Sequence, residues 1–174
     1  MIPLKYSKIS SAVSAPYKST AGSACYDLYA YLPERLPVQK YITSSASYVD
    51  QVQKGMEVMV LGGSIPFKKF DRVMVPTGLF FEIPQGYCVK IYPRSGNSIK
   101  KGWGVINSVG IIDSDYRDEI KILMVNFGND SIISMNDKIA QMEVVPTHEI
   151  DWQEVESLEA AQTERIGGFG STGN

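Results

Sequence analysis

Short strand-like runs separated by turn signals constrain the fold of this 174-residue chain more than any other feature. The runs are rich in β-branched and aromatic residues, and turn formers such as Pro84-Gln85-Gly86 separate neighbouring runs. They cover 71–84, 87–93, 103–107, 119–128 and 137–146. Many short strands at near-regular spacing predict an all-β protein, a barrel or a jelly roll.

Three stretches depart from this rhythm. One short helix is expected just after Ser95-Gly96, and a second over the charged stretch 151–162. Residues about 35–68 mix strand-like runs with Ser-rich and Gly-Gly stretches. We interpret them as an insertion on the surface of the barrel, either a hairpin or a small extra subdomain. The predicted organisation is one domain over 1–162 and a flexible Gly-rich tail over 163–174.

Composition excludes several classes of protein. Hydrophobic residues make up 44% of the chain, which is enough to form a core. Lys and Arg number 17 against 19 Asp and Glu, so no basic surface for a nucleic-acid polymer is expected. No apolar run reaches the roughly 18 residues of a membrane span, and the start lacks a secretory apolar region. The two cysteines show neither metal-site spacing nor the pattern of a disulfide framework. We therefore expect a protein of the reducing cytoplasm.

The Gly-rich tail contains the letters GxGxxG in residues 168–173. A Rossmann motif needs a strand before these glycines and a helix after them, and here the chain ends one residue later. Glycines still allow backbone N–H groups to approach a phosphate, Ser171 and Thr172 add donors, and Arg165 adds a positive fork. The alternative is a tail without a ligand.

A polar turn after one strand-like run and a polar residue inside another are further candidates for binding. Arg94, Ser95 and Gly96 combine a guanidinium, a hydroxyl and an open backbone, which suits an anion; the alternative is a turn with a solvated arginine. Gln141 stands inside an apolar run and needs partners if it is buried. The alternative for Gln141 is a purely structural hydrogen bond.

The stretch 106–120 leads from apolar residues into a group of carboxylates. Asp113 and Asp115 have the spacing of a calcium loop, but Asp118 and Met124 occupy the positions that such a loop gives to Gly and Glu. We therefore predict a hairpin in which residues 109–112 hold Asp113 at a strand end. The alternative is an acidic turn exposed to water.

Five stretches resemble, in order, the five motifs of the trimeric deoxyuridine triphosphatases (dUTPases). They are "GSACYDLYA" (22–30), "PRSG" (93–96), "GIIDSDYRDEI" (110–120), "DKIAQM" (137–142) and "RIGGFGSTG" (165–173). The resemblance spans nearly the whole chain except residues about 35–68. Five motifs in the family's order are specific, whereas no single motif would be.

The resemblance implies a jelly-roll homotrimer with three active sites at subunit interfaces. It implies hydrolysis of dUTP to dUMP and pyrophosphate with Mg²⁺, by attack of water on the α-phosphate. Such an enzyme limits uracil incorporation into DNA and supplies dUMP for dTMP synthesis. An all-protein metal cage is not required, because Mg²⁺ keeps several waters and binds substrate oxygens.

The resemblance also implies a role for each matched residue. Asp113 matches the carboxylate that activates water, and Asp27 the first-motif aspartate that approaches the metal through water. Tyr116 matches the ring beneath the deoxyribose, and Asn107 a residue that helps to read uracil. The implied substrate-binding set is Arg94, Ser95, Gly96, Asn107, Gly110, Tyr116, Gln141, Arg165, Phe169, Gly170, Ser171 and Thr172.

Several positions depart from the family pattern. Cys25 and Asp118 replace glycines, and Asn97-Ser98 replaces Leu-Ala after the phosphate-binding turn. Ile166 also replaces a glycine, and the spacing from Arg165 to Phe169 is one residue short. An insertion of this kind resembles phage or viral members, for which the compartment would be the host cytoplasm.

Two rival functions remain open at this point. A deaminase of dCTP shares the fold and would need a further carboxylate placed against the base. A regulatory protein of the same fold would bind a protein partner through residues about 35–68.

Overall fold

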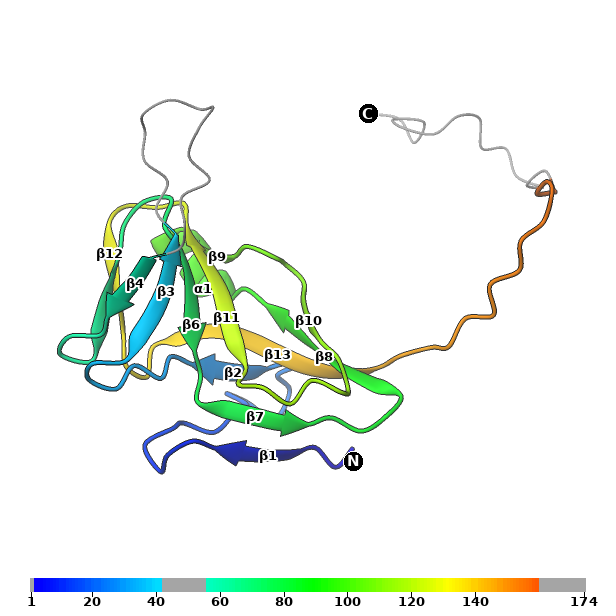
Figure 1. Ribbon diagram of the computed structural model, residues 1–174, viewed down its shortest axis with the longest axis horizontal. Coiled ribbons are helices and arrows are strands. Elements are labelled where there is room, and N and C mark those ends of the chain that lie inside the picture. Colours follow the sequence, from blue (N-terminus) through cyan, green and yellow to red (C-terminus); the bar gives the residue numbers. More distant parts are fainter. Residues whose placement is uncertain (1, 42–55, 160–174) are drawn as a thin grey trace.

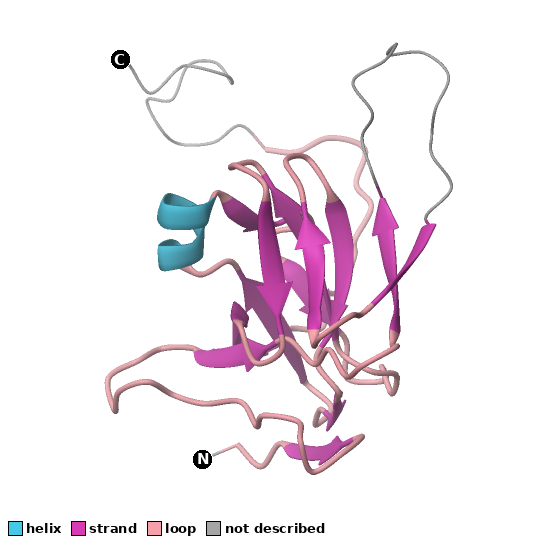
Figure 2. Cartoon of the chain, turned by 90° about the vertical axis from the view of Figure 1, so that its left-hand side faces the viewer, coloured by secondary structure: helices cyan, strands magenta, loops and turns pink. Residues whose placement is uncertain are grey.

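The computed structural model describes residues 2–41 and 56–159. Its antiparallel sheets stack into a barrel-like body, from which the C-terminal segment extends (Figures 1 and 2). The largest sheet has the order β4(Met56–Met59), β3(Pro37–Tyr41), β6(Arg72–Pro76), β11(Lys121–Asn126), β9(Trp103–Val105). The second has the order β10(Gly110–Ile112), β8(Tyr87–Tyr92), β13(Lys138–Pro146), β2(Tyr26–Tyr29). Two pairs complete the body: β1(Lys5–Lys8) with β7(Leu79–Glu82), and β5(Ser64–Phe67) with β12(Ser131–Ser134). The all-β jelly-roll prediction is confirmed.

Strand alternation builds the core. In β6, Val73 and Val75 are buried while Arg72 is exposed, as expected for a period of two. Trp103 is 1% exposed and meets the ring of Phe67 edge-on at 5.6 Å. This aromatic pair joins the largest sheet to the β5–β12 pair.

The run at 71–84 forms two strands instead of one because Gly78 separates them. Its φ is +68°, and a Cβ there would lie 2.4 Å from Cγ2 of Val13. Only glycine suits both this backbone conformation and this contact. The bend directs β7 to pair with β1 and leaves β6 in the largest sheet.

The helix predicted after Ser95-Gly96 is present as α1(Ser95–Lys101). The helix ends at Gly102, whose φ is +70°. The backbone N–H of Gly102 donates hydrogen bonds to the carbonyls of Asn97 and Ser98. The second predicted helix is wrong for residues 151–159, which are exposed and carry no helix. This charged stretch packs on no sheet within the chain, and a short helix without tertiary contacts is marginal in water.

Within residues 35–68, strands β3 and β4 pair antiparallel, as in the hairpin alternative, but the described residues are part of the body of the protein. Strand β3 pairs with β6, and β5 pairs with β12, so both belong to the sheets of the body. Val38, Val60 and Phe67 are each at most 2% exposed. The described parts of this region are core strands, and residues 42–55 lie outside the described residues.

Candidate active site

Four of the five motif stretches meet on the four-stranded sheet. Asp27 lies on β2 and Gln141 on β13, directly opposite each other in the register. Gln141 also pairs with Tyr92 at the end of β8, and Arg94 follows two residues later. Asp113 follows the last residue of β10. Strand pairing therefore brings together residues that are more than 100 positions apart in sequence.

Asp27 is the centre of one polar cluster. The residue is 5% exposed, and its Oδ1 accepts a hydrogen bond from Arg94 Nε at 2.7 Å. Its Oδ2 lies 2.8 Å from Lys138 Nζ and accepts a bond from Ser19 Oγ at 3.1 Å. Burial raises the pKa of Asp27, but the bonds from Lys138, Arg94 and Ser19 outweigh it, and the pKa is lowered. The carboxylate is thus ionised and holds two cations.

Gln141 supports the same cluster from the neighbouring strand. Its Nε2 donates to the Pro93 carbonyl at 2.9 Å, next to Arg94. The structural hydrogen bond considered for this residue is therefore present. A phosphate contact by Gln141 stays a prediction.

The hairpin after β9 forms a separate pocket of about 540 Å³. Asn107, Asp113 and Tyr116 line it together with apolar residues of β6, β7 and β11. Its volume lies in the range of small-molecule sites. The three residues that the sequence assigned to base, sugar and water therefore share one cavity.

Local contacts brace this hairpin. The Tyr116 hydroxyl donates to the Glu119 carbonyl at 3.0 Å, and Arg117 Nη1 donates to the Ser114 carbonyl at 2.6 Å. Burial, followed by the charges of Asp118 and Glu119, raises the pKa of Tyr116. Its hydroxyl is therefore neutral near pH 7. Asp113 itself is exposed at the strand end, where water can reach it.

The Asp27 cluster and the hairpin pocket do not form one site within a chain. Strands β8 and β10 run antiparallel with Ile112 opposite Val89, so Asp113 stands near Cys88. Arg94 lies six residues beyond Cys88, about 20 Å away at the rise of an extended strand. One triphosphate cannot place its attacked phosphorus beside Asp113 and its bound phosphates beside Arg94 of the same chain.

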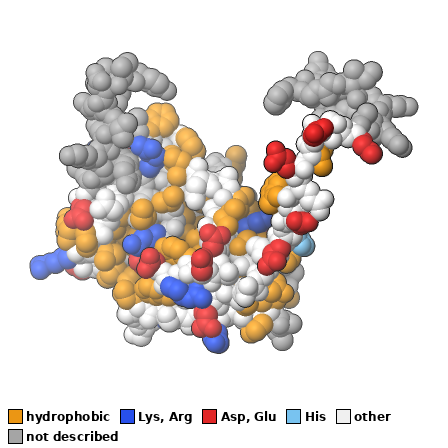
Figure 3. All heavy atoms as spheres, turned by 45° about the vertical axis from the view of Figure 1, so that its right-hand side comes forward, with side chains coloured by type: hydrophobic (Ala, Val, Ile, Leu, Met, Phe, Trp, Pro, Cys, Tyr) orange, Lys and Arg blue, Asp and Glu red, His pale blue; other side chains and the backbone are white. Residues whose placement is uncertain are grey.

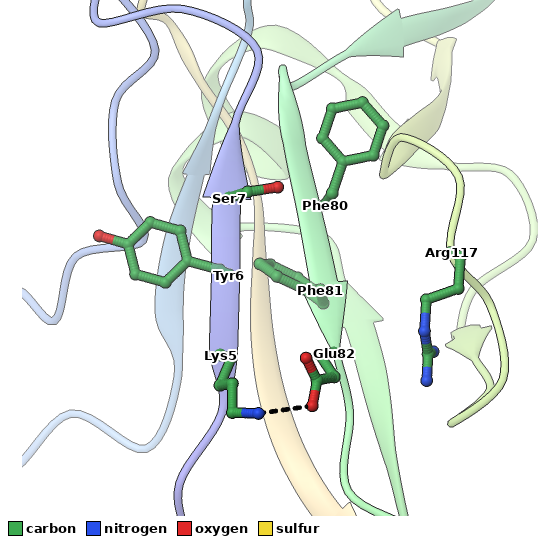
Figure 4. Close-up of a pocket in the computed structure, with 7 residues that line it drawn as sticks. All are labelled: Lys5, Tyr6, Ser7, Phe80, Phe81, Glu82 and Arg117. Atoms are coloured by element: carbon green, nitrogen blue, oxygen red, sulfur yellow. Dashed lines mark hydrogen bonds and ion pairs between the residues drawn. The ribbon is translucent and has the colours of Figure 1, made fainter.

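Another cavity, of about 360 Å³, lies between β1 and β7 (Figure 4). An exposed ion pair of 2.8 Å between Lys5 and Glu82 crosses it, and Phe80 and Arg117 stand at its other side. None of the site residues predicted from the sequence lines it. We therefore place the candidate active site at the Asp27 cluster and the hairpin pocket.

The sequence model of the dUTPase family matches residues 64–173. The chain belongs to the dUTPase family. It is 42% identical over 135 residues to a deoxyuridine 5'-triphosphate nucleotidohydrolase of Hydrogenobaculum sp. (strain Y04AAS1), covering 76% of this chain and 88% of that protein. It is 44% identical over 140 residues to the protein of that name from Finegoldia magna, covering 79% and 92%.

Solved structures of phage dUTPases share the fold. A dUTPase of Staphylococcus bacteriophage 80alpha, solved with dUpNHpp, superposes with a TM-score of 0.73 at 18% identity over 99% of both chains. The dUTPase of phage phi11 of S. aureus gives 0.66 at 17% identity, over 91% of this chain and 99% of that one. The recognition of the family from its motifs is confirmed.

Two departures from the dUTPase motifs now have a structural setting. Asn97 is 8% exposed, and its Nδ2 donates to the Lys138 carbonyl at 2.7 Å, so it links α1 to β13. Asp118 lines the hairpin pocket with Asp113. Nothing in the structure explains Cys25 at the position where glycine is usual.

Sequence reasoning missed Lys138 and Ser19, which both contact Asp27. Lys138 lies within the fourth motif stretch, but a lysine at a strand start is ordinarily solvated. Only its ion pair with Asp27, which is distant in sequence, distinguishes Lys138 from a solvated lysine. Arg165, Phe169, Gly170, Ser171 and Thr172 of the fifth motif lie outside the described residues.

The described residues contain no group of three His, Cys, Asp or Glu side chains placed to hold a metal ion. Both oxygens of Asp27 already bind cations or a hydroxyl. This donor set fits Mg²⁺ only as an ion carried largely by phosphate oxygens. Within residues 2–41 and 56–159, no helix is long and apolar enough to cross a membrane.

Proposed function

We propose that this chain hydrolyses dUTP to dUMP and pyrophosphate; its relatives are named as nucleotidohydrolases of deoxyuridine 5'-triphosphate. The observation that carries the proposal is the hairpin pocket, in which the exposed Asp113 stands with Asn107 and Tyr116. These are the residues that the family motifs assign to water, base and sugar.

Asp113 would act as the general base. It is exposed at the end of a three-residue strand whose pairing with β8 limits its motion. A carboxylate at hydrogen-bond distance from water can take its proton as the water attacks the α-phosphorus. Assistance of this kind contributes on the order of 10²–10⁴-fold.

Asn107 and Tyr116 would select the nucleoside. Behind Asn107, Gly110 is buried, and a Cβ there would lie 3.3 Å from Ile91 Cβ and 3.4 Å from Asn107 Nδ2, so glycine leaves room for the amide. The amide can then offer a donor and an acceptor to the uracil edge. The Tyr116 ring, held through its hydroxyl, would exclude a sugar 2′-hydroxyl.

The triphosphate would bind at Arg94, Ser95, Gly96 and Gln141. Arg94 contacts Asp27 through Nε, and its two terminal nitrogens are the pair suited to phosphate oxygens. Ser95 and Gly96 are exposed beside it at the start of α1. Asp27 acts here as the partner of Arg94, and its water-mediated approach to a metal stays a prediction.

Mg²⁺, when bound to the triphosphate, would neutralise phosphate charge. Arg94 adds a positive charge, and Gln141 supports the turn that carries it. These residues would hold the triphosphate while Asp113 takes the proton of the water that attacks the α-phosphorus.

The active form would be a homotrimer in which neighbouring subunits complete each site. The separation of about 20 Å between Asp113 and Arg94 supports this, because a second chain has to supply one of the two groups. Residues 147–159 extend away from the body (Figure 1) and carry many acidic side chains (Figure 3). Trp152 and Leu158 in this segment are 85% and 87% exposed, as expected for residues that pack on another subunit.

The tail of residues 163–174 would complete the site. The family match continues to residue 173 and includes this stretch. Phe169 would stack on the base, while Arg165, Gly170, Ser171 and Thr172 would contact phosphate. A chain truncated after Gln162 should fold and assemble but turn over dUTP severely more slowly, as measured by pyrophosphate release; full activity would contradict this role.

The central experiment measures pyrophosphate and ammonia release from dUTP, dCTP and dTTP, with and without Mg²⁺. We expect pyrophosphate from dUTP alone, and only with Mg²⁺. Ammonia from dCTP would instead identify a deaminase. Asp113→Asn should lose nearly all turnover and still bind dUTP, and normal turnover by this variant would exclude the proposed base.

A further inference from the structure

Lys138 reaches the phosphate-binding cluster because β13 is irregular at its start. The register pairs Lys138 with Tyr29 and Ala140 with Leu28, so one extra residue of β13 is accommodated there. Both Ile139 and Ala140 are buried, whereas Lys138 is half-buried like Gln141. A β-bulge of this kind re-aims a side chain. In a regular strand, Lys138 would share the inward face of Ala140.

The re-aimed side chain is held on several sides. Lys138 Nζ lies 2.8 Å from Asp27 Oδ2, and 6.0 Å and 5.9 Å from the ring centroids of Tyr17 and Tyr29. The carbonyl of Lys138 accepts a bond from Asn97 on α1. The residue is therefore connected to the phosphate-binding turn through both its side chain and its backbone.

Asp27 divides its two oxygens between Lys138 and Arg94. If Oδ2 lost its lysine, only the Ser19 hydroxyl would remain on it, and the carboxylate could turn both oxygens toward the guanidinium. Arg94 would then turn its terminal nitrogens toward Asp27, because a bidentate pair is the preferred arginine–carboxylate geometry. Lys138 thus keeps Arg94 bound through Nε alone.

We propose that Lys138 is a positioning residue for triphosphate binding, acting through Asp27 to leave the terminal nitrogens of Arg94 for phosphate. This inference rests on the proposed dUTP hydrolysis. The two cations on one carboxylate also leave one net positive charge beside Ser95 and Gly96.

The test is a double-mutant cycle in the full-length protein. Lys138→Met should lower kcat/KM for dUTP about tenfold, mainly through KM, since one charge-assisted hydrogen bond near substrate is misdirected. Lys138→Arg should recover most of it. In an Arg94→Met background, the same Lys138→Met change should cost less than about twofold. Equal losses in both backgrounds, or full kcat/KM for Lys138→Met, would overturn the proposal.

Two controls separate this result from other failures. Lys5→Met removes a surface lysine with the same 2.8 Å carboxylate distance and should leave kcat/KM unchanged. If Lys138→Met does not fold, Lys138→Leu, which also lacks an N–H donor, takes its place in the cycle and is judged by the same criteria. A wild-type protein without activity on dUTP would refute the proposed function itself.

Discussion

Two aspartates of this protein form ion pairs with lysine, but the two lysines differ in how much of the side chain is exposed to solvent. Asp71 and Lys40 are 1% and 4% exposed and form an ion pair of 2.6 Å. The lysine also donates to the Pro66 carbonyl, and Asp71 accepts from the Lys68 N–H. Asp27 is nearly as buried, but its partners Lys138 and Arg94 reach solvent, with side chains 36% and 26% exposed.

The two ion pairs differ in whether their cations reach solvent. The Lys40–Asp71 pair has its partners inside the protein and joins β3 to the loop after β5. The Asp27 cluster leaves cationic atoms at the surface beside Ser95 and Gly96, where we propose that phosphate binds. The first pair should therefore control stability, and the second should control activity.

The largest expected effect is on stability, in Lys40→Met. Removing one partner leaves the Asp71 carboxylate buried and unpaired, which costs about 3–5 kcal/mol. For a chain of this size the loss corresponds to a fall in Tm of about 6–20 °C. Thermal unfolding measures it. The double variant Lys40→Met/Asp71→Leu should be more stable than Lys40→Met, and a Tm no higher than that of the single variant would contradict the assignment.

The next effect is on activity, in Asp27→Asn. The amide keeps the shape of the side chain but no longer fixes Arg94 by charge. We expect a loss in kcat/KM for dUTP of about tenfold to a hundredfold, the range for a hydrogen bond to a charged group. Steady-state kinetics and Tm are measured together. A large fall in Tm with unchanged kinetics would reverse the comparison between the two aspartates.

A smaller effect is the pH dependence of the Asp27 contribution. Because the folded pKa lies below the ordinary value of 3.8, the contribution is present above that value and is lost as pH falls through the folded pKa. The difference in unfolding free energy between wild type and Asp27→Asn should be constant from about pH 8 to pH 5. It should shrink below pH 4 in urea titrations at fixed protein concentration. A difference that grows on acidification would refute the lowered pKa.

The smallest effect is expected for Lys5→Ala. The Lys5–Glu82 pair is exposed, with side chains 75% and 57% accessible, so water and salt replace it readily. Neither Tm nor kcat/KM should change measurably. A clear change in either would show that exposure does not decide which lysine–carboxylate pairs matter here.

Much of the fold followed from local patterns. The alternation in 87–93 and 137–146 predicted β8 and β13, and Ser95-Gly96 marked the start of α1. The prediction gave strand-like runs at 35–68 but failed to place them in the sheets, because their partners, β6 and β12, are distant in sequence. It also failed at 151–159, where helical propensity had no surface to pack against.

The sequence predicted some residues of the candidate site and missed others. Asp113, Asn107 and Tyr116 were predicted because they lie close together in the stretch 106–120, and all three line one pocket. Lys138 was missed because its importance depends on a bulge and on a carboxylate 111 positions away. No local pattern marks such a contact.

The sequence by itself determined the family and most strand positions, since motif order and side-chain alternation are properties of neighbouring residues. Only the tertiary structure decided which side chains meet. Strand pairing placed Asp27 beside Arg94 and Lys138, enclosed Asp71 with Lys40, and separated Asp113 from Arg94. Register depends on pairing between distant strands, and a shift of one residue would turn strand residues such as Asp27 and Lys40 to the other face.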